Sequence, residues 1–128
     1  MFNDLDVLRM SMSMARHAGA RQAVIAQNVA NADTPGYRAR DLPSFVDSLE
    51  RPAMELRASR PGHLTAKGPF PAMLPAPRPA DGPGAPNGNT VSLEHEMLRA
   101  VEAQRAHNRA VQIYQTSLGV LRSALGRP

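Results

Sequence analysis

Apolar and small residues recur at alternating spacings of three and four along the N-terminal part of the chain. The repeat passes through Leu5, Leu8, Met12, Ala15, Gly19, Gln22, Ala26 and Val29. These spacings place side chains on one face of an α-helix, and a sustained heptad repeat is typical of a coiled-coil seam. The pattern predicts a long helix from Leu5 to about Asn31, which is about 40 Å at a rise of ~1.5 Å per residue.

The same spacing returns from Val91 onward and predicts a second long helix. Its seam passes through Leu93, Met97, Ala100, Gln104, His107, Val111, Tyr114, Leu118, Leu121 and Leu125. Thr90 or Ser92 is placed to cap the first turn, where Glu94 and Glu96 suit the positive end of the helix dipole. Because the first seam carries few large apolar side chains, we expect the two helices to pair with each other and with other chains.

The first helix is predicted to stop at a sharp turn after Asn31. Pro35 disfavours the helical conformation for Thr34, and Gly36 readily takes the positive φ that a reversing turn requires. Beyond the turn, the apolar positions between Leu42 and Leu49 indicate one short amphipathic turn or strand that packs back.

Proline and glycine dominate the middle of the chain, between Arg51 and Asn89. This composition cannot sustain a helix interior or a central strand, so the region is predicted to be loop or linker. From Pro75 to Asn89 we expect an extended or disordered segment, at least before assembly. A short pair of strands is predicted between Met54 and Ala66.

The predicted fold class is mainly α, with two long terminal helices that pair like a coiled coil around an irregular middle with short β strands. We divide the chain into an N-terminal helix and turn (residues 1–42), an irregular Pro/Gly-rich middle (43–90) and a C-terminal helix (91–128), which together form one assembly domain. Three Phe, two Tyr and no Trp supply little material for a large core. We therefore expect the isolated chain to be partly unfolded and assembly to complete it.

The formal net charge is +4, and Lys67 is the single lysine among fifteen basic residues. The arginines are scattered, which disfavours a nucleic-acid groove, whereas arginine often pairs with carboxylates at subunit interfaces. Without cysteine, the chain has no disulfide, thiolate nucleophile or cysteine-ligated metal. Its first residues do not resemble a cleavable secretory signal, and no stretch is long and apolar enough to span a bilayer.

An enzyme is one alternative. The candidate catalytic or metal-binding residues for it are the four histidines His17, His63, His95 and His107. His95-Glu96 matches the opening of a zinc-protease helix motif, but Arg99 stands where the second histidine ligand must be. The segment from Gly82 to Gly88 is not a phosphate-binding loop, because its prolines lack N–H donors. A catalytic triad assembled only in space stays open at this point. We predict no catalytic residue, cofactor or metal.

Two segments resemble a known family. We find similarity to the N-terminal signature of flagellar rod, hook and hook-associated axial proteins in Ala26-Gln27-Asn28-Val29-Ala30-Asn31-Ala32-Asp33-Thr34-Pro35-Gly36-Tyr37. Two further stretches resemble the proximal-rod members of that family in particular: Arg38-Ala39-Arg40-Asp41-Leu42 and Gly88-Asn89-Thr90-Val91-Ser92-Leu93-Glu94-His95-Glu96-Met97.

The resemblance implies a structural subunit of the bacterial flagellar rod, the hollow drive shaft that transmits torque and passes exported subunits. It implies export through the flagellar type III pathway without cleavage, and helical stacking in the periplasm near the membrane ring. The expected partners are copies of itself, other rod proteins, and export-gate and membrane-ring components near the rod base. Nucleic acid and small-molecule substrates are not expected.

We predict an assembly interface on the turn and on both helical seams. Asn28 and Asn31 can satisfy backbone groups at the helix end or across subunits. Pro35 and Gly36 set the turn, and Tyr37 offers an aromatic anchor with a polar tip. The complete predicted set is Leu5, Leu8, Met12, Asn28, Asn31, Thr34, Pro35, Gly36, Tyr37, Met97, Gln104, Val111, Tyr114, Leu118 and Leu121. On the residues alone, a helix stop without partner contacts is the competing interpretation.

Two other functions stay open at this point: a different short rod protein of the same family, or a basic coiled-coil adaptor for nucleic acid or a membrane surface. The adaptor is supported by the basic net charge and the amphipathic ends. It is disfavoured because Tyr37 and Tyr114 lie at the turn and on a seam, not among clustered basic residues.

Overall fold

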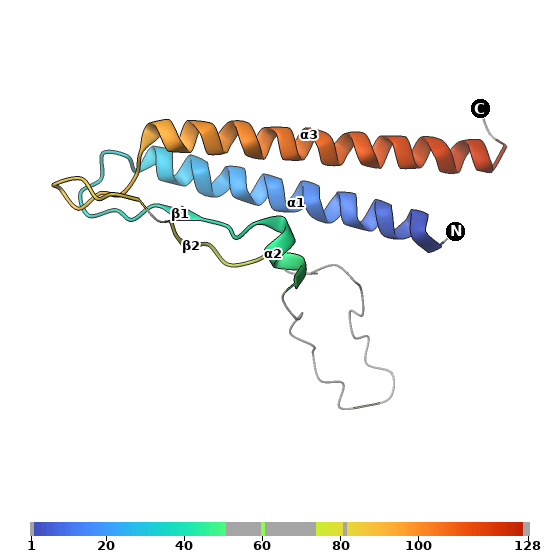
Figure 1. Cartoon of the computed structure of the whole chain (residues 1–128), viewed down its shortest axis with the longest axis horizontal. Helices are drawn as coiled ribbons and strands as arrows, with labels where there is room; N and C mark the ends of the chain where they lie inside the picture. The colour runs from blue at the N-terminus through green and yellow to red at the C-terminus, as the bar shows by residue number, and fades with distance from the viewer. Residues whose placement is uncertain (1, 51–59, 61–73, 81, 127–128) are drawn as a thin grey trace.

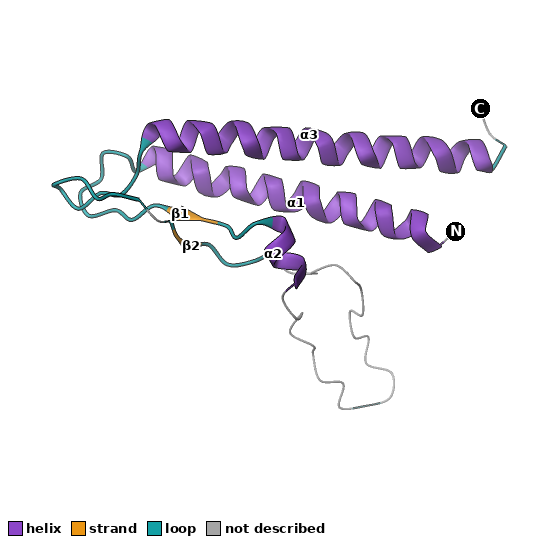
Figure 2. Ribbon diagram, in the orientation of Figure 1, coloured by secondary structure: helices purple, strands orange, loops and turns teal. Residues whose placement is uncertain are grey.

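The computed structural model describes residues 2–50, 60, 74–80 and 82–126. Within these ranges two long antiparallel helices lie side by side, α1 (Phe2–Ala30) and α3 (Leu93–Ala124) (Figure 1). The short helix α2 (Phe45–Glu50) and the two-residue strands β1 (Arg40–Asp41) and β2 (Arg78–Pro79) lie on the α1 side of this pair (Figure 2). The predicted mainly α fold, with two long terminal helices around an irregular middle, is confirmed.

Small residues form the contact between α1 and α3. Ala18 on α1 and Ala103 and Ala110 on α3 are buried, and Ser11 and Ile25 are buried on the same face of α1 as Ala18. Each set is spaced by seven residues, so each helix keeps one edge toward the other over several turns. Small side chains let the backbones approach closely but bury little apolar surface, so this contact stabilises the pair weakly for its length.

The predicted seams lie one residue away from this contact. On α1, Met12 is 44% exposed whereas Ser11 is buried, and on α3, Met97 is 69% exposed whereas Glu96 is buried. Six of the ten positions of the predicted α3 seam are partly buried: Ala100, His107, Val111, Tyr114, Leu118 and Leu121. The predicted pairing of the two helices is confirmed, and the centre of their contact lies on the stripes next to the predicted seams. The two neighbouring stripes share one period, and the stripe with smaller side chains allows the closer approach.

The start of α3 depends on tertiary contacts more than on a side-chain cap. Ser92 occupies the N-cap position, and its carbonyl accepts the amide of Glu96 at 2.9 Å. Within the described chain the Ser92 hydroxyl makes no capping hydrogen bond; it lies 3.0 Å from Nδ1 of His95. Thr90, the other predicted cap, accepts the backbone amide of Ala39 at its hydroxyl, at 2.8 Å.

The middle of the chain packs along α1 as an arm, which we define as residues 39–50. β1 and β2 pair antiparallel, with Arg40 opposite Pro79 and Asp41 opposite Arg78. The segment predicted as a turn or strand near Leu42 contains the helix α2. The strand pair predicted between Met54 and Ala66 lies outside the described residues.

The segment expected to be extended or disordered before assembly is only partly so. Residues 74–80 have no regular secondary structure apart from β2. Residues 85–89 form a turn instead, in which the amide of Ala85 donates to the carbonyl of Asn89 at 2.7 Å and the amide of Gly88 donates to the carbonyl of Ala85 at 2.8 Å. This turn is held against the end of α1, so the segment is not a free linker there.

Apolar side chains are distributed more on the outside of the molecule than inside it. Among the described residues the buried apolar side chains are Ala18, Val24, Ile25, Ala39, Leu42, Ala103 and Ala110. Large exposed apolar side chains on the long helices include Leu5, Val7, Met10, Met12, Val29, Leu93, Met97, Leu98, Val101, Ile113 and Val120. In the described segments neither long helix, nor α2, has the length and apolarity needed to cross a membrane. This much exposed apolar surface on one molecule is typical of an interaction surface.

Candidate assembly surface

The chain leaves α1 through a turn at residues 31–37. The amide of Asn31 donates to the carbonyl of Asn28 at 3.0 Å, and the amide of Thr34 donates to the carbonyl of Asn31 at 3.0 Å. The amide of Tyr37 then donates to the carbonyl of Thr34 at 3.2 Å. Gly36 has φ 73°, a left-handed conformation that glycine adopts without strain. The predicted helix stop and the predicted role of Gly36 in the turn are confirmed.

Residues 87–90 hold this turn from the other side. The amide of Gly36 donates to the carbonyl of Asn87 at 3.0 Å, and the amide of Thr90 donates to the carbonyl of Tyr37 at 3.0 Å. Nδ2 of Asn89 lies between 2.7 and 3.0 Å from the carbonyl oxygens of Asn31, Ala32 and Thr34. The end of α1 and the start of α3 thus form one hydrogen-bonded unit, at the left end of the molecule in Figure 1.

Asn28 is fully buried and joins three elements. Its Nδ2 donates to the carbonyl of Arg40 at 2.7 Å, and its Oδ1 accepts the amide of Arg40 at 3.1 Å. The same Nδ2 donates to the Glu96 carboxylate at 3.0 Å, and the Tyr37 hydroxyl donates to Oδ1 at 3.3 Å. The predicted role of Asn28 in satisfying backbone groups is confirmed, and the groups it satisfies belong to its own chain.

A cluster of charged side chains continues from Asn28 along the side of the helix pair that faces the arm. Glu96, which is 1% exposed, accepts from Arg99 at 2.8 Å. Arg21 donates two hydrogen bonds to Asp41, at 3.0 and 2.9 Å, in a bidentate pair. Arg99 also lies 3.7 Å from Asp41, and Arg21 lies 3.8 Å from Glu102. The cluster links α1, β1 and α3 through fixed charge pairs.

The charge cluster shifts the pKa of two of its members. Burial alone would raise the pKa of Asp41, but the hydrogen bond from Arg21 and the charges of Arg21 and Arg99 outweigh it and hold the pKa below its ordinary value. The hydrogen bond to Asp41 raises the pKa of Arg21 against the opposing effect of burial. Both groups are therefore charged near neutral pH.

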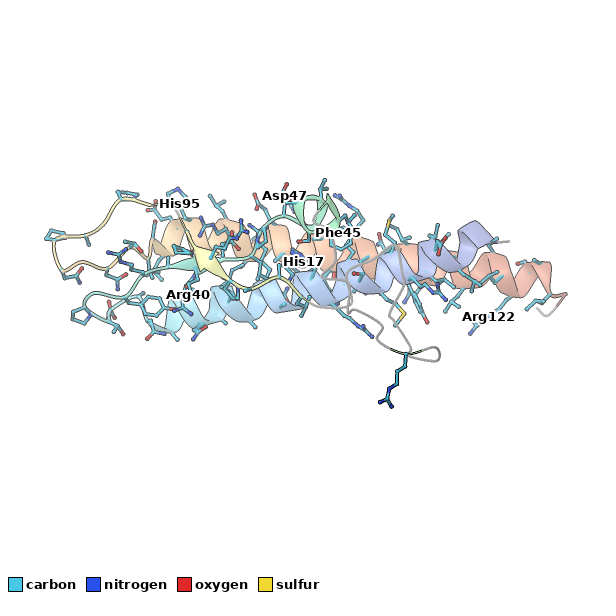
Figure 3. All side chains as sticks on the ribbon, turned by 90° about the horizontal axis from the view of Figure 1, so that it is seen from below. His17, Arg40, Phe45, Asp47, His95 and Arg122 are labelled. Carbon is cyan, nitrogen blue, oxygen red and sulfur yellow. The ribbon has the colours of Figure 1, made fainter. Side chains whose placement is uncertain are left out.

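His17, one of the histidines considered above for catalysis, instead anchors the arm. Its Nε2 donates to the carbonyl of Pro43 at 2.9 Å. Its ring meets the ring of Phe45, the first residue of α2, edge to face with centroids 5.6 Å apart, and Figure 3 shows the two residues next to each other. No group of three or more His, Asp or Glu side chains in residues 2–50, 60, 74–80 and 82–126 is arranged to hold a metal ion.

The predicted seams meet on the side of the helix pair that lies away from the arm. The arm contacts α1 and α3 through His17, Arg21 and Arg99. On the other side Nε2 of Gln22 donates to Oε1 of Gln104 at 2.7 Å, so these two seam positions adjoin. The remaining seam positions are spaced by three and four from Gln22 and Gln104 and share their faces of the helices.

We call this side the open face. It is defined by Leu5, Leu8, Met12, Ala15, Gly19, Gln22 and Val29 on α1 and by Met97, Ala100, Gln104, Val111, Tyr114, Leu118 and Leu121 on α3. Nine of these positions are large apolar or aromatic side chains that are exposed or partly exposed: Leu5, Leu8, Met12, Val29, Met97, Val111, Tyr114, Leu118 and Leu121. The open face is therefore largely apolar, with two glutamines in contact within it.

The predicted interface residues divide into three groups by exposure. Those exposed are Leu5, Met12, Thr34, Pro35, Gly36, Met97 and Gln104. Those half-buried are Leu8, Asn31, Tyr37, Val111, Tyr114, Leu118 and Leu121, and Asn28 alone of the set is buried. Direct contact with a neighbouring chain at Asn28 would require this end of the molecule to open. Its part in assembly stays a prediction, as does that of the others.

Sequence reasoning missed the structural roles of Asn89, Glu96 and the Arg21–Asp41 pair. Asn89 and Glu96 belong to a segment used only for its resemblance, and Glu96 was assigned only to the helix dipole. A signal did exist. Glu96 lies seven residues before Ala103 in the small-residue stripe of α3, and Asn28 lies three residues after Ile25 on α1. A polar residue at such a position often sets the register of two helices.

Comparison with known proteins bears on this architecture. The family described as "Flagella basal body rod protein" matches residues 8–38, which include most of α1 and the turn. The flagellar basal body rod protein FlgB of Yersinia enterocolitica is 33% identical over 131 residues, covering 94% of this chain and 90% of that protein. FlgB of Salmonella typhimurium is 34% identical over 135 residues, covering 98% and 92%. FlgB of Aquifex aeolicus is 32% identical over 101 residues, covering 79% and 77%.

Proposed function

The chain belongs to the FlgB family of flagellar basal-body rod proteins and is a structural subunit of the rod, and we propose that it joins its neighbours through the open face and the turn at residues 31–37. Membership of this family supports a part in motility and assembly with other rod components of the basal body. Our proposal concerns which surfaces of this chain make the contacts and where in the rod it sits.

The open face supports the proposal because it presents large apolar side chains that the chain itself leaves uncovered. Met12 and Met97 lie on the two helices on either side of the Gln22–Gln104 contact, and both are exposed. A helix of a neighbouring subunit laid along this stripe would bury them together, in the manner of an added coiled-coil strand. This pairing of exposed apolar positions on two adjacent helices is the observation that carries the proposal.

The turn supports the proposal in a different way, because it is rigid and outward-facing. Thr34, Pro35 and Gly36 are exposed, yet the turn is hydrogen-bonded to residues 87–90. A surface that is already ordered loses little conformational entropy when a neighbour binds it.

We further propose that the chain lies in the proximal rod, in the periplasm near the membrane ring, after export through the flagellar type III pathway. The chain would stack helically with other subunits to form a hollow drive shaft. Its partners would be copies of itself, other rod proteins, and export-gate and membrane-ring components. Family membership supports this placement at the level of the basal-body rod. The proposal gives the chain no catalytic role and no cofactor.

The first test is whether the chain is present in purified basal bodies at the level of known rod subunits, measured by mass spectrometry. The second maps the interface. Because the chain has no cysteine, a single introduced cysteine reports on one position only. We expect the thiols of Met12→Cys and Met97→Cys to react with maleimide in the free chain and to be protected in assembled rods.

Val46→Cys, at an exposed position on α2, controls for incorporation of the variant chain and for access of the reagent. If the thiols at positions 12 and 97 react as readily in rods as in the free chain, the open face is not an assembly interface.

A further inference from the structure

We propose that Asn89 is a positioning residue through which the start of α3 sets the conformation of the turn at residues 31–37. Its Nδ2 lies 3.0, 2.7 and 2.9 Å from the carbonyl oxygens of Asn31, Ala32 and Thr34, so its two N–H donors are shared among three acceptors. A helix leaves its last carbonyls without intrahelical partners, and here one side-chain amide gathers the carbonyls that follow α1. The functional part of this inference rests on the proposed role of the turn in assembly.

The orientation of the Asn89 amide is determined by its surroundings. Since carbonyl oxygens only accept hydrogen bonds, the atom that faces the three carbonyls must be the nitrogen. The other atom, Oδ1, accepts the amide of Val91 at 2.7 Å. The backbone amide of Asn89 donates to Oδ1 of Asn87 at 3.0 Å, and the Asn89 side chain is buried. Every polar group of Asn89 therefore has a partner, and a change at Nδ2 acts on the turn alone.

The two loops that Asn89 joins are far apart in sequence and close in space. A Cβ placed on Gly88 would lie 3.4 Å from the Cα of Gly36, so the two loops pass close enough that a side chain at residue 88 would fill the space between them. Gly36 donates to Asn87, and Thr90 donates to Tyr37. The turn is therefore not complete with its own residues, and it takes this conformation only when the segment before α3 is in place.

The inference predicts that Asn89→Asp loosens the turn without separating the helices. Aspartate keeps the Oδ1 acceptor for Val91 but replaces the donor with an oxygen that repels the three carbonyls. Asn87→Asp is the matched control, because it adds the same charge two residues away and retains the Oδ1 that accepts from Asn89. Asn89→Ala removes the donor without adding charge, and it also removes the Oδ1 acceptor of the Val91 amide, so it should loosen the turn at least as much as Asn89→Asp.

The measurement is amide hydrogen exchange of the full-length chain, read by NMR where circular dichroism shows both helices formed. In Asn89→Asp and Asn89→Ala we expect the protection of Gly36 and Tyr37 to fall by roughly tenfold or more, as for loss of a buried hydrogen bond. The amides of Ile25 and Ala103, in the helix contact, should keep wild-type protection. Asn87→Asp should leave all four amides near their wild-type values.

Retained protection at Gly36 and Tyr37 would overturn the inference. An equal loss at all four amides would also overturn it, because that is the signature of general destabilisation. Motility of cells that carry each variant tests the proposed function separately. If Asn89→Asp loosens the turn and the cells still swim, Asn89 positions the turn as inferred, but the turn is not required for assembly.

Discussion

Nδ2 of Asn28 on α1 donates a hydrogen bond of 3.0 Å to the carboxylate of Glu96 on α3, and both side chains are enclosed by the protein. A carboxylate is costly to bury unless it is hydrogen-bonded and paired, and here Arg99 pairs with it. Among the described residues no buried side-chain nitrogen or oxygen lacks a partner. This contact, between the last turn of α1 and the first turn of α3, aligns the two helices where apolar burial is modest.

Asn28→Ala should destabilise the chain by about 2–3 kcal/mol, because it leaves the backbone groups of Arg40 and one oxygen of Glu96 without their partner. Urea unfolding followed by circular dichroism, at a concentration where the helices are formed, measures the change. Asn108→Ala removes an exposed amide on α3 and should change stability by less than about 0.5 kcal/mol. Equal unfolding midpoints for the two variants would contradict the role given to Asn28.

Gly36→Val should abolish motility, whereas Gly36→Asn should retain most of it. A Cβ at position 36 meets no described atom within 4 Å, so the cost of a side chain arises from φ 73° and not from a clash. A β-branched residue in the left-handed region costs about 1–3 kcal/mol, and asparagine tolerates this region better. Swimming in soft agar and rod counts in electron micrographs measure the effect. A Gly36→Val strain that swims would count against a requirement for the left-handed conformation at residue 36.

Acid should weaken the chain through Asp41. The folded-state pKa of Asp41 is lowered, so its contribution is fully present above the unfolded pKa of about 3.9 and is lost as the pH falls through the lower folded value. Asp41→Asn should therefore reduce stability at neutral pH and flatten the loss of stability below about pH 4. Thermal unfolding between neutral and acid pH tests this. Asp33→Asn, at an exposed position, is the control and should leave the wild-type profile in place.

Met97→Asp should block rod assembly while leaving the folded chain unchanged. Residue 97 is exposed on the open face, so a charge there costs little until a neighbour covers it. Gln112→Asp adds the same charge at an exposed position about half a helical turn from the buried Ala110, away from α1. We expect loss of motility in the first strain and swimming in the second, with equal unfolding midpoints. Normal rods with Met97→Asp would remove this part of the open face from the interface.

Much of the secondary structure could be predicted because its signals are local. The heptad spacings predicted both long helices, and Pro35 and Gly36 predicted where the first one stops. The register of the pair could not be predicted in the same way. Met12 and Ser11 lie on neighbouring stripes of the same period, and the interpretation favoured the stripe with larger side chains. Close approach of the backbones selects the other.

The sequence by itself determined two amphipathic helices, a Pro-Gly turn between the first helix and the irregular middle of the chain, and a signature specific enough to indicate the family. Only the tertiary structure decided which helix faces meet, which side the arm covers, and that Asn28 pairs with Glu96 and Asn89 with the carbonyls after α1. The physical reason is range: helix and turn propensities act within a few residues, whereas these hydrogen bonds join residues 57 and 68 positions apart and form only when the end of α1 meets the start of α3.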